Sequence, residues 1–356
     1  MNFKDIFSFR KALHSIPEFS LEEVETRKAI VGKLNTYSNL EVHDMGLFIY
    51  AVYHGADKRP PVAFRADFDA VMGKNGRPGH YCGHDGHTAA LVAFAEYVNE
   101  TKPERTVYFL FQPAEETGAG AKLCTEFIKE NNIGEIYGIH NIPGYKEGTV
   151  ILIQNTFACA SCGLELTFKG AQSHAAYPEE GKNPALIIAD VIRFVSEVSN
   201  RESEGLLLVT VIGCEIGSNS YGVSAGEGVL RLTVRGENPE EFESLLSEIK
   251  EYAESLADKN GIECSVRELE KFPATVNYNS NISVTEECAI RVGADYIYRK
   301  EPFRWSEDFG HYLNICKGAF IGIGAGEKCP GLHTDDYEFP DEIIKPIVEL
   351  YSELVK

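Results

Sequence analysis

The stretch Thr106-Val-Tyr-Phe-Leu-Phe111, followed directly by Gln112-Pro-Ala-Glu115-Glu116, decides the fold class of this chain. Its first half is an almost unbroken apolar run, which is typical of a strand that is buried on both faces. A helix bounded by glycine is expected to follow at about 119–131. A buried strand that ends in polar residues and leads into a helix is the repeating unit of an α/β fold.

The same alternation continues on both sides of this stretch. Further strands are predicted at 47–53, 61–64, 136–139 and 319–324. Helices are predicted at 3–36 with a break at Pro17, at 88–99, 283–292 and 308–314, and from 341 onward. This order of elements predicts an α/β domain, in which a mostly parallel sheet carries helices on both faces.

The pattern changes near residue 155. Strands at 161–168, 206–212 and 228–235, with a possible fourth at 264–268, accompany helices at 184–200 and 239–260. A sheet with two helices on one face is a self-contained α+β unit. We therefore predict a discontinuous catalytic domain, 1–156 and 271–356, and an inserted lid or dimerisation domain, 157–270.

Composition narrows the functional classes. The formal net charge of −20 argues against nucleic acid and anionic membranes as partners. No apolar run has the length of a membrane span, and the first residues lack the layout of a signal peptide. The nine cysteines are scattered, so we expect a reduced, cytoplasmic protein. Cys159 and Cys162 form a CxxC pair that we interpret as strand or strand-edge residues.

Polar residues gather where the predicted strands end. Asp67 and Asp69 follow the strand at 61–64, the Glu115-Glu116 pair follows 106–111, His140 ends 136–139, and His333 lies beyond 319–324. Taken singly, each has a structural explanation, such as an Asx turn or a helix N-terminus. Taken together, they lie at the carboxyl edge of one sheet, where open α/β sheets bind ligands.

The stretch His80-Tyr-Cys82-Gly-His84-Asp-Gly-His87 adds a thiol and imidazoles to this edge. His and Cys are the usual ligands of borderline-soft divalent metals. Five side chains form an adequate ligand set for two such ions if one ligand or a water bridges them: Cys82, His84, Glu116, His140 and His333. Amide hydrolysis also needs a carboxylate that is not a ligand, and Glu115 fits the role of general base that takes a proton from water.

Six motifs occur in the order found in the N-acyl-amino-acid amidohydrolases. They are Arg65-Ala-Asp-Phe-Asp69-Ala, Cys82-Gly-His-Asp-Gly-His87, Phe111-Gln-Pro-Ala-Glu-Glu116, Ser173-His-Ala-Ala-Tyr-Pro178, Ser306-Glu-Asp-Phe309 and Leu332-His333. The opening Leu13-His-Ser-Ile-Pro17-Glu18 is also similar. The chain thus resembles the aminoacylase, hippurate-hydrolase and auxin-conjugate-hydrolase branch of the di-metal aminoacylase/carboxypeptidase G family. The resemblance implies a di-zinc exopeptidase-like catalytic domain with an inserted lid.

By motif position, the resemblance assigns the five side chains above to the metal ligands and Glu115 to the general base. Asp69 matches a carboxylate that orients a metal-bound histidine. His174 matches a lid histidine that assists the oxyanion, often in the partner subunit, and Arg235 resembles a lid arginine that could bind the substrate carboxylate. The loop between Asp69 and Cys82 is shorter than in the family and does not open with Leu-Pro.

The sequence therefore predicts a metal-dependent hydrolase that deacylates N-acyl amino acids with a metal-bound water and Glu115 as base. We expect two divalent ions (zinc, manganese, cobalt or nickel), a small-molecule substrate and a homodimer formed through the inserted domain. A dipeptidase or aminopeptidase of the same family is the main alternative. A binding protein without turnover and a cysteine hydrolase with Cys82 as nucleophile are alternatives of other classes.

Overall fold

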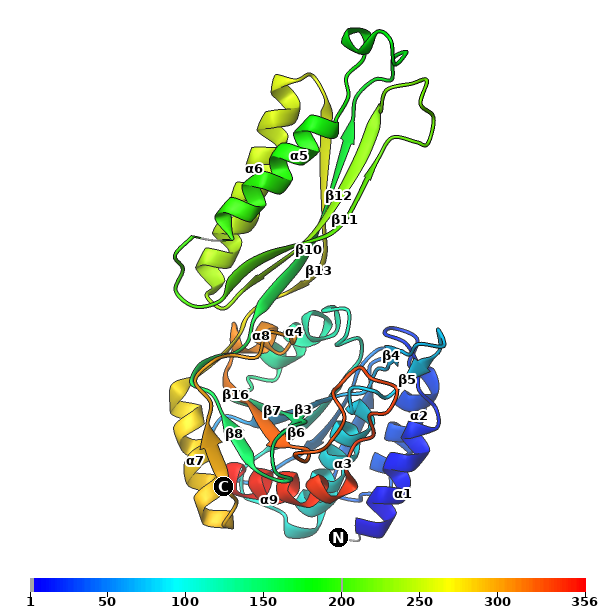
Figure 1. The fold of residues 1–356 in the computed structure, drawn as a ribbon. Coiled ribbons are helices and arrows are strands. Elements are labelled where there is room, and N and C mark those ends of the chain that lie inside the picture. Colours follow the sequence, from blue (N-terminus) through cyan, green and yellow to red (C-terminus); the bar gives the residue numbers. More distant parts are fainter. Residues whose placement is uncertain (1–2, 200) are drawn as a thin grey trace. The chain divides into compact units, whose positions relative to one another are not determined.

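The computed structural model describes residues 3–199 and 201–356, so residues 1–2 and the last residue of the predicted helix 184–200 lie outside the described residues. The chain forms two compact units (Figure 1). The first unit is Met1–Phe157, Thr275–Pro302 and Glu307–Lys356, and the second is Ala158–Ala274 with Phe303–Ser306. The short segment Phe303–Ser306 joins the second unit because Phe303 pairs with Ala158 and accepts a hydrogen bond from the Cys159 amide at 3.1 Å.

The main sheet of the first unit is mostly parallel at its centre. Its strands run in the order β1-β2-β6-β3-β7-β16-β8-β15. They are β1 (Glu41–Asp44), β2 (Ile49–Tyr53), β3 (Val62–Asp67), β6 (Val107–Gln112), β7 (Glu135–Ile142), β8 (Val150–Leu152), β15 (Tyr296–Tyr298) and β16 (Lys317–Gly324). The central strands β6, β3, β7 and β16 are parallel to one another, whereas β2 and β8 run antiparallel to their inner neighbours. The predicted α/β fold is confirmed.

Helices cover both faces of this sheet (Figure 1). They are α1 (Phe3–His14), α2 (Val24–Leu34), α3 (His84–Thr101), α4 (Gly120–Glu130), α7 (Asn279–Val292), α8 (Gly310–Leu313) and α9 (Ile344–Leu354), with the 3₁₀ turn η2 (Asp341–Ile343) before α9. Helix α3 packs against α1 and α9 on one face, and α4 packs against α8 on the other. Phe64 of β3 anchors the first face, since its ring lies 4.7 Å from that of Phe94 and 4.5 Å from that of Tyr351.

The remaining strands of the first unit form two small pairs. A hairpin joins β4 (Val71–Met72) to β5 (Pro78–Gly79), and β9 (Asn155–Ala158) pairs with β14 (Thr275–Asn277). The hairpin lies within the loop between Asp69 and Cys82. Among the described residues, no helix combines the length and the apolar character needed to cross a membrane.

The carboxyl ends of β3, β6 and β7 lie at one edge because these strands are parallel and in register, with Asp67 opposite Gln112. Two elements differ from the sequence prediction here. Strand β7 continues to Ile142, so His140 lies inside the strand. Helix α3 begins at His84, one turn before the predicted start at residue 88, because Gly83 adopts a left-handed conformation (φ 94°) that turns the chain into the helix.

The second unit is an antiparallel sheet with the strand order β11-β12-β10-β13. Its elements are β10 (Ala160–Lys169), η1 (Pro178–Glu180), α5 (Ala185–Val198), β11 (Leu207–Ile216), β12 (Glu227–Gly236), α6 (Pro239–Lys259) and β13 (Glu263–Phe272). In β12, buried and more exposed residues alternate, and the two helices lie along one face of the sheet (Figure 1). Cys162 is a buried residue of β10 and Cys159 lies just before the first residue of that strand, in agreement with the strand or strand-edge interpretation of the CxxC pair.

Candidate metal centre and active site

The predicted metal donors come from separate elements of the first unit. Cys82 and His84 flank Gly83 at the start of α3, and His140 lies on β7. Two features require glycine at position 83. Its backbone is left-handed, and a Cβ atom would lie 2.8 Å from the Asn141 side chain. The His333 loop is tied to the same region, because the His333 amide donates to the Tyr81 carbonyl at 2.8 Å.

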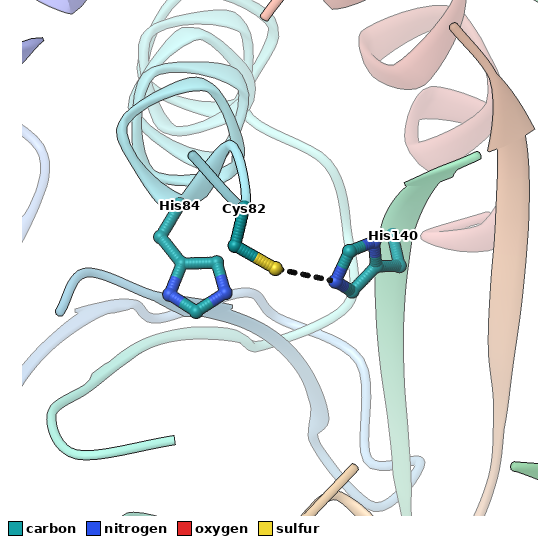
Figure 2. A group of neighbouring side chains, drawn as sticks. All are labelled: Cys82, His84 and His140. Carbon is teal, nitrogen blue, oxygen red and sulfur yellow. Dashed lines mark hydrogen bonds between the residues drawn. The ribbon is translucent and has the colours of Figure 1, made fainter. Parts of the chain in front are cut away.

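The donor atoms lie at spacings that suit metal ligation. Cys82 Sγ is 3.6 Å from His140 Nε2 (Figure 2) and 3.3 Å from His333 Nε2. Glu116 Oε1 is 3.4 Å from His333 Nε2 and 3.6 Å from His84 Nε2. Donors bound at about 2.0–2.3 Å to one tetrahedral ion lie about 3.3–3.8 Å apart, so these spacings match.

The five donors form two overlapping groups. Cys82, His84 and His140 make one group, and Cys82 makes a second with Glu116 and His333. Figure 2 shows the Cys82 thiol pointing between the two imidazoles of the first group. Cys82 belongs to both groups, so its thiolate would be available to an ion held by either one.

Two of the candidate metal-donor atoms are buried and make no hydrogen bond within the described residues. They are His84 Nε2 and Glu116 Oε1. His84 Nδ1 is 3.0 Å from Asp69 Oδ1, and His140 Nδ1 is 2.9 Å from the Asn141 carbonyl. Each Nδ1–H therefore donates outward and leaves the Nε2 lone pair for a metal ion, an arrangement common among metal-binding histidines.

Asp69 is thus the residue that orients His84, a partner that the sequence left open. Its second oxygen accepts hydrogen bonds from Ser20 Oγ at 2.7 Å and from the Glu116 amide at 3.1 Å. One buried carboxylate therefore fixes the imidazole of one candidate ligand and the backbone of another.

The electrostatics of the site favour positive charge. Burial opposes protonation of His84, but the carboxylates of Asp67 and Asp69 outweigh it and raise its pKa to about 10. Burial, together with Glu116, raises the pKa of the Cys82 thiol well above its usual range. Burial lowers the pKa of His140, which keeps that imidazole neutral. A divalent cation would supply the missing charge and hold the thiol as a thiolate, so the donor set fits metal ions.

Glu115 lies beside the donors and is more deeply buried than Glu116. Its Oε2 is 3.8 Å from His84 Nε2, and its side chain is 6% exposed against 17% for Glu116. The turn that precedes the pair has a left-handed Ala114 (φ 51°) whose amide donates to Glu23. Burial, followed by the charges of Glu307 and Glu116, raises the pKa of Glu115 well above its usual range.

His174 and Arg235 belong to the second unit, whereas the five donors, Glu115 and Asp69 belong to the first. His174 is exposed in the loop after β10, and its Nδ1 accepts a hydrogen bond from the Ala176 amide at 3.0 Å. In the neutral ring this places the proton on Nε2, which is then a donor. Arg235 Nη1 donates to the Arg304 carbonyl at 2.9 Å and to Ser306 Oγ at 3.0 Å.

His87 shares a motif with the ligands but has a different part in the structure. Its Nδ1 is 2.6 Å from Asp67 Oδ1, and its Nε2 contacts Asn141 Oδ1. Because neighbouring side chains engage both ring nitrogens, this geometry favours a supporting role for His87 over metal ligation.

A buried charge network beneath the donors was not predicted from the sequence. Arg65 donates to Asp67 at 2.7 Å, to Glu307 at 3.0 Å and to Asp308 at 2.9 Å. The motifs around residues 65–69 and 306–309 contain all four side chains, but nothing in their spacing indicates that a single guanidinium joins them.

Comparison with known proteins is consistent with this geometry. A sequence model of peptidase family M20/M25/M40 matches residues 63–356. An N-acetyldiaminopimelate deacetylase from Leuconostoc mesenteroides subsp. mesenteroides is 26% identical over 366 residues, which cover 97% of this chain and 95% of that protein.

Two solved structures align along nearly their full lengths. A candidate aminohydrolase from methicillin-resistant Staphylococcus aureus has a TM-score of 0.91 at 24% identity, with 99% of this chain and 96% of that chain covered. A dinuclear metal-binding peptidase of the M20 family from Bacillus subtilis has a TM-score of 0.84 at 25% identity, with 99% and 97% covered. The likeness therefore extends over both units.

Proposed function

The chain belongs to peptidase family M20/M25/M40, and we propose that within this family it is a metal-dependent amidohydrolase that removes the acyl group from N-acyl amino acids. The family match confirms the resemblance that the motifs predicted and makes the protein a hydrolase of amide bonds. The observation that carries the proposal is the cluster of five candidate metal donors with the buried Glu115 beside it. The deacetylase among the relatives favours an acylated amino acid as substrate.

The cluster fits two divalent ions held by Cys82, His84, Glu116, His140 and His333. Bound there, such ions would polarise the scissile carbonyl and acidify a water molecule. Glu115 takes a proton from the attacking water at its carboxylate and later delivers it to the departing amine nitrogen. Asp69 keeps His84 in the tautomer and orientation that ligation needs.

We further propose that the second unit acts as a lid, carries a homodimer contact and supplies His174 to an active site. The support is its self-contained fold and the Nε2–H donor that the loop geometry leaves on His174. Such a donor would stabilise the oxyanion that forms when the amide carbonyl is attacked. Binding of the substrate carboxylate by Arg235 would require its bonds to Arg304 and Ser306 to be exchanged.

The experiment is a deacylation screen on protein stripped with EDTA and reloaded with zinc, manganese, cobalt or nickel in turn. Acetyl, benzoyl and longer-chain acyl amino acids, acetylated diaminopimelate and unblocked dipeptides serve as substrates. We expect metal-dependent release of the free amino acid from at least one acylated substrate. Preferential cleavage of dipeptides would instead favour the peptidase alternative. Inhibition by thiol alkylation without any effect of EDTA would point to a cysteine hydrolase.

A further inference from the structure

Glu23 lies at the start of α2, yet its carboxyl group reaches a turn of the candidate active site. Its Oε1 accepts a hydrogen bond from the Ala114 amide at 2.9 Å, across 91 positions of the chain. Glu23 is 6% exposed and Ala114 is fully buried. Ala114 directly precedes the Glu115-Glu116 pair. A buried hydrogen bond therefore connects the N-terminal helices to the turn that carries the proposed base.

The carboxyl group of Glu23 does not serve the helix on which it lies. Glu23 occupies the N-cap position of α2, but its side chain makes no capping hydrogen bond there. The Glu18 side chain takes that role, since its oxygens accept from the Glu25 amide at 3.1 Å and from the Thr26 amide at 2.8 Å. Helix capping thus does not explain a buried carboxyl group at position 23.

Ala114 depends on this bond because its backbone is strained. Its φ of 51° is left-handed, a conformation that costs free energy in a residue with a Cβ atom. A buried amide without an acceptor would add a second cost. On the other side of the residue, the Ala114 carbonyl accepts from the Gly120 amide at 3.1 Å. The Glu23 carboxyl group thus provides the acceptor that lets this strained conformation persist.

The two glutamates that follow Ala114 have separate backbone anchors. The Glu116 amide donates to Asp69 Oδ2 at 3.1 Å, so a carboxylate other than Glu23 holds the backbone of the candidate ligand. The bond to Glu23 instead fixes the residue that leads directly into Glu115. Loss of the Glu23 acceptor should therefore displace the base more than the ligand.

We propose that Glu23 is a positioning residue for the general base: by accepting from the Ala114 amide, it holds the strained turn in the conformation that places Glu115 beside the metal donors. The inference rests on the proposed function of Glu115. It assigns to Glu23 the part of a hydrogen-bond acceptor of fixed reach, and its negative charge is not required.

The role does not depend on the protonation state of Glu23. Burial raises the pKa of Glu23 to about 7, hydrogen bonds from backbone amides lower it in part, and the charges of Asp69 and Glu18 add to the rise. A carboxyl oxygen can accept from an amide whether the group is ionised or neutral. A side-chain amide oxygen at the same position should therefore replace it.

Two conservative substitutions separate the acceptor from the charge. Glu23→Gln keeps an acceptor oxygen at the same reach and removes the charge. Glu23→Asp keeps the carboxyl group but draws it back by about 1.5 Å, the length of one carbon–carbon bond, out of range of the Ala114 amide. We expect Glu23→Gln to retain most of kcat, and Glu23→Asp to lose on the order of 10- to 100-fold in kcat, as for a displaced reacting group. KM and metal content should stay close to wild type in both variants.

Glu22 provides the matched control, because it is exposed, lies one position earlier and has the same side chain. Glu22→Gln and Glu22→Asp should both keep wild-type kcat.

Three outcomes would overturn the proposal. A loss of kcat in Glu23→Gln equal to or larger than that in Glu23→Asp would mean that the acceptor oxygen is not what matters. Wild-type kcat in both variants would mean that Glu23 does not act through Glu115. Loss of metal in Glu23→Asp in proportion to the loss of kcat would mean that the bond holds the ligands and not the base.

A second measurement does not depend on turnover. Hydrogen exchange of the backbone amides of residues 112–118, followed by mass spectrometry on the metal-loaded protein, should be faster in Glu23→Asp than in the wild type and unchanged in Glu23→Gln. Unchanged exchange in Glu23→Asp would refute the anchor even if every substrate in the deacylation screen failed. Faster exchange together with a failed screen would support the anchor and would reject only the proposed reaction.

Discussion

The adjacent glutamates Glu115 and Glu116 should fail in different ways when each is changed to glutamine. Glu115 is buried beside the donor cluster, and its Oε2 lies 3.8 Å from His84 Nε2. Glutamine has the same size but cannot accept a proton from water. Loss of a positioned acid/base typically costs on the order of 10²–10⁴ in rate, so Glu115→Gln should lower kcat by that factor. This corresponds to about 2.7–5.5 kcal/mol in the activation barrier.

The same substitution should leave the metal-free fold intact. Burial and Glu307 raise the pKa of Glu115 well above its usual range, which favours the neutral side chain in the metal-free protein. Glu115→Gln then exchanges one neutral group for another of equal volume. Thermal unfolding in EDTA should therefore give the wild-type Tm.

Glu116→Gln should lose metal, because its Oε1 lies 3.6 Å from His84 Nε2 and 3.4 Å from His333 Nε2 and carries the charge of one donor group. Loss of a hydrogen-bond partner behind a ligand typically costs about 10–100-fold in metal affinity, and loss of the donor itself should cost at least as much. Metal content by elemental analysis and kcat on reloaded protein are the two assays. A metal-depleted Glu115→Gln together with a fully loaded but inactive Glu116→Gln would refute the assignment.

Three further predictions concern the same site. Asp69→Asn should weaken metal binding by about 10–100-fold because it removes the carboxylate behind His84, and Ser20→Ala, which removes only one donor to that carboxylate, should have a much smaller effect in the same competition titration. If His174 completes a partner's site, mixing inactive His174→Ala chains with inactive Glu115→Gln chains should restore activity, and verified mixed dimers without recovery would contradict this. Metal binding should release protons, since the pKa of His84 in the metal-free protein is about 10. His84 is then protonated below that pH, so metal affinity should rise with pH through the neutral range, and calorimetry in buffers of different ionisation enthalpy should detect the released proton.

The sequence predicted the position of the site better than the hydrogen bonds and ion pairs within it. The strands that carry the site are long, apolar and followed by turns, so their carboxyl ends could be identified from local pattern alone. His140 on β7 and the Glu115-Glu116 pair after β6 come to the same edge because β6 and β7 both pair in parallel with β3. Strand β15 is exposed along its whole length and therefore lacks the apolar pattern from which a strand is predicted.

Two features could not be predicted for physical reasons. The first turn of α3 contains histidine, aspartate and glycine, which are weak helix formers and lie outside the apolar pattern, so the predicted start at residue 88 was too late. Arg65 and Glu307 are 242 positions apart in the chain, and only folding brings the guanidinium into contact with the carboxyl groups of both motifs, at residues 65–69 and 306–309. Local sequence pattern carries no information about a contact of that range.

The charge balance of the site links metal loading to the state of the base. Arg65 pairs with three buried carboxyl groups near the donors, Asp67, Glu307 and Asp308, and the buried carboxyl groups of Asp69 and Glu115 face His84. A buried cluster of this kind is stable only when positive charge or protons compensate it. Without metal, protons are favoured in that role, because the pKa values of His84 and Glu115 are both raised. Two divalent ions would replace those protons, so under the proposed function the loading that prepares the carbonyl for attack also leaves Glu115 ionised and able to act as a base.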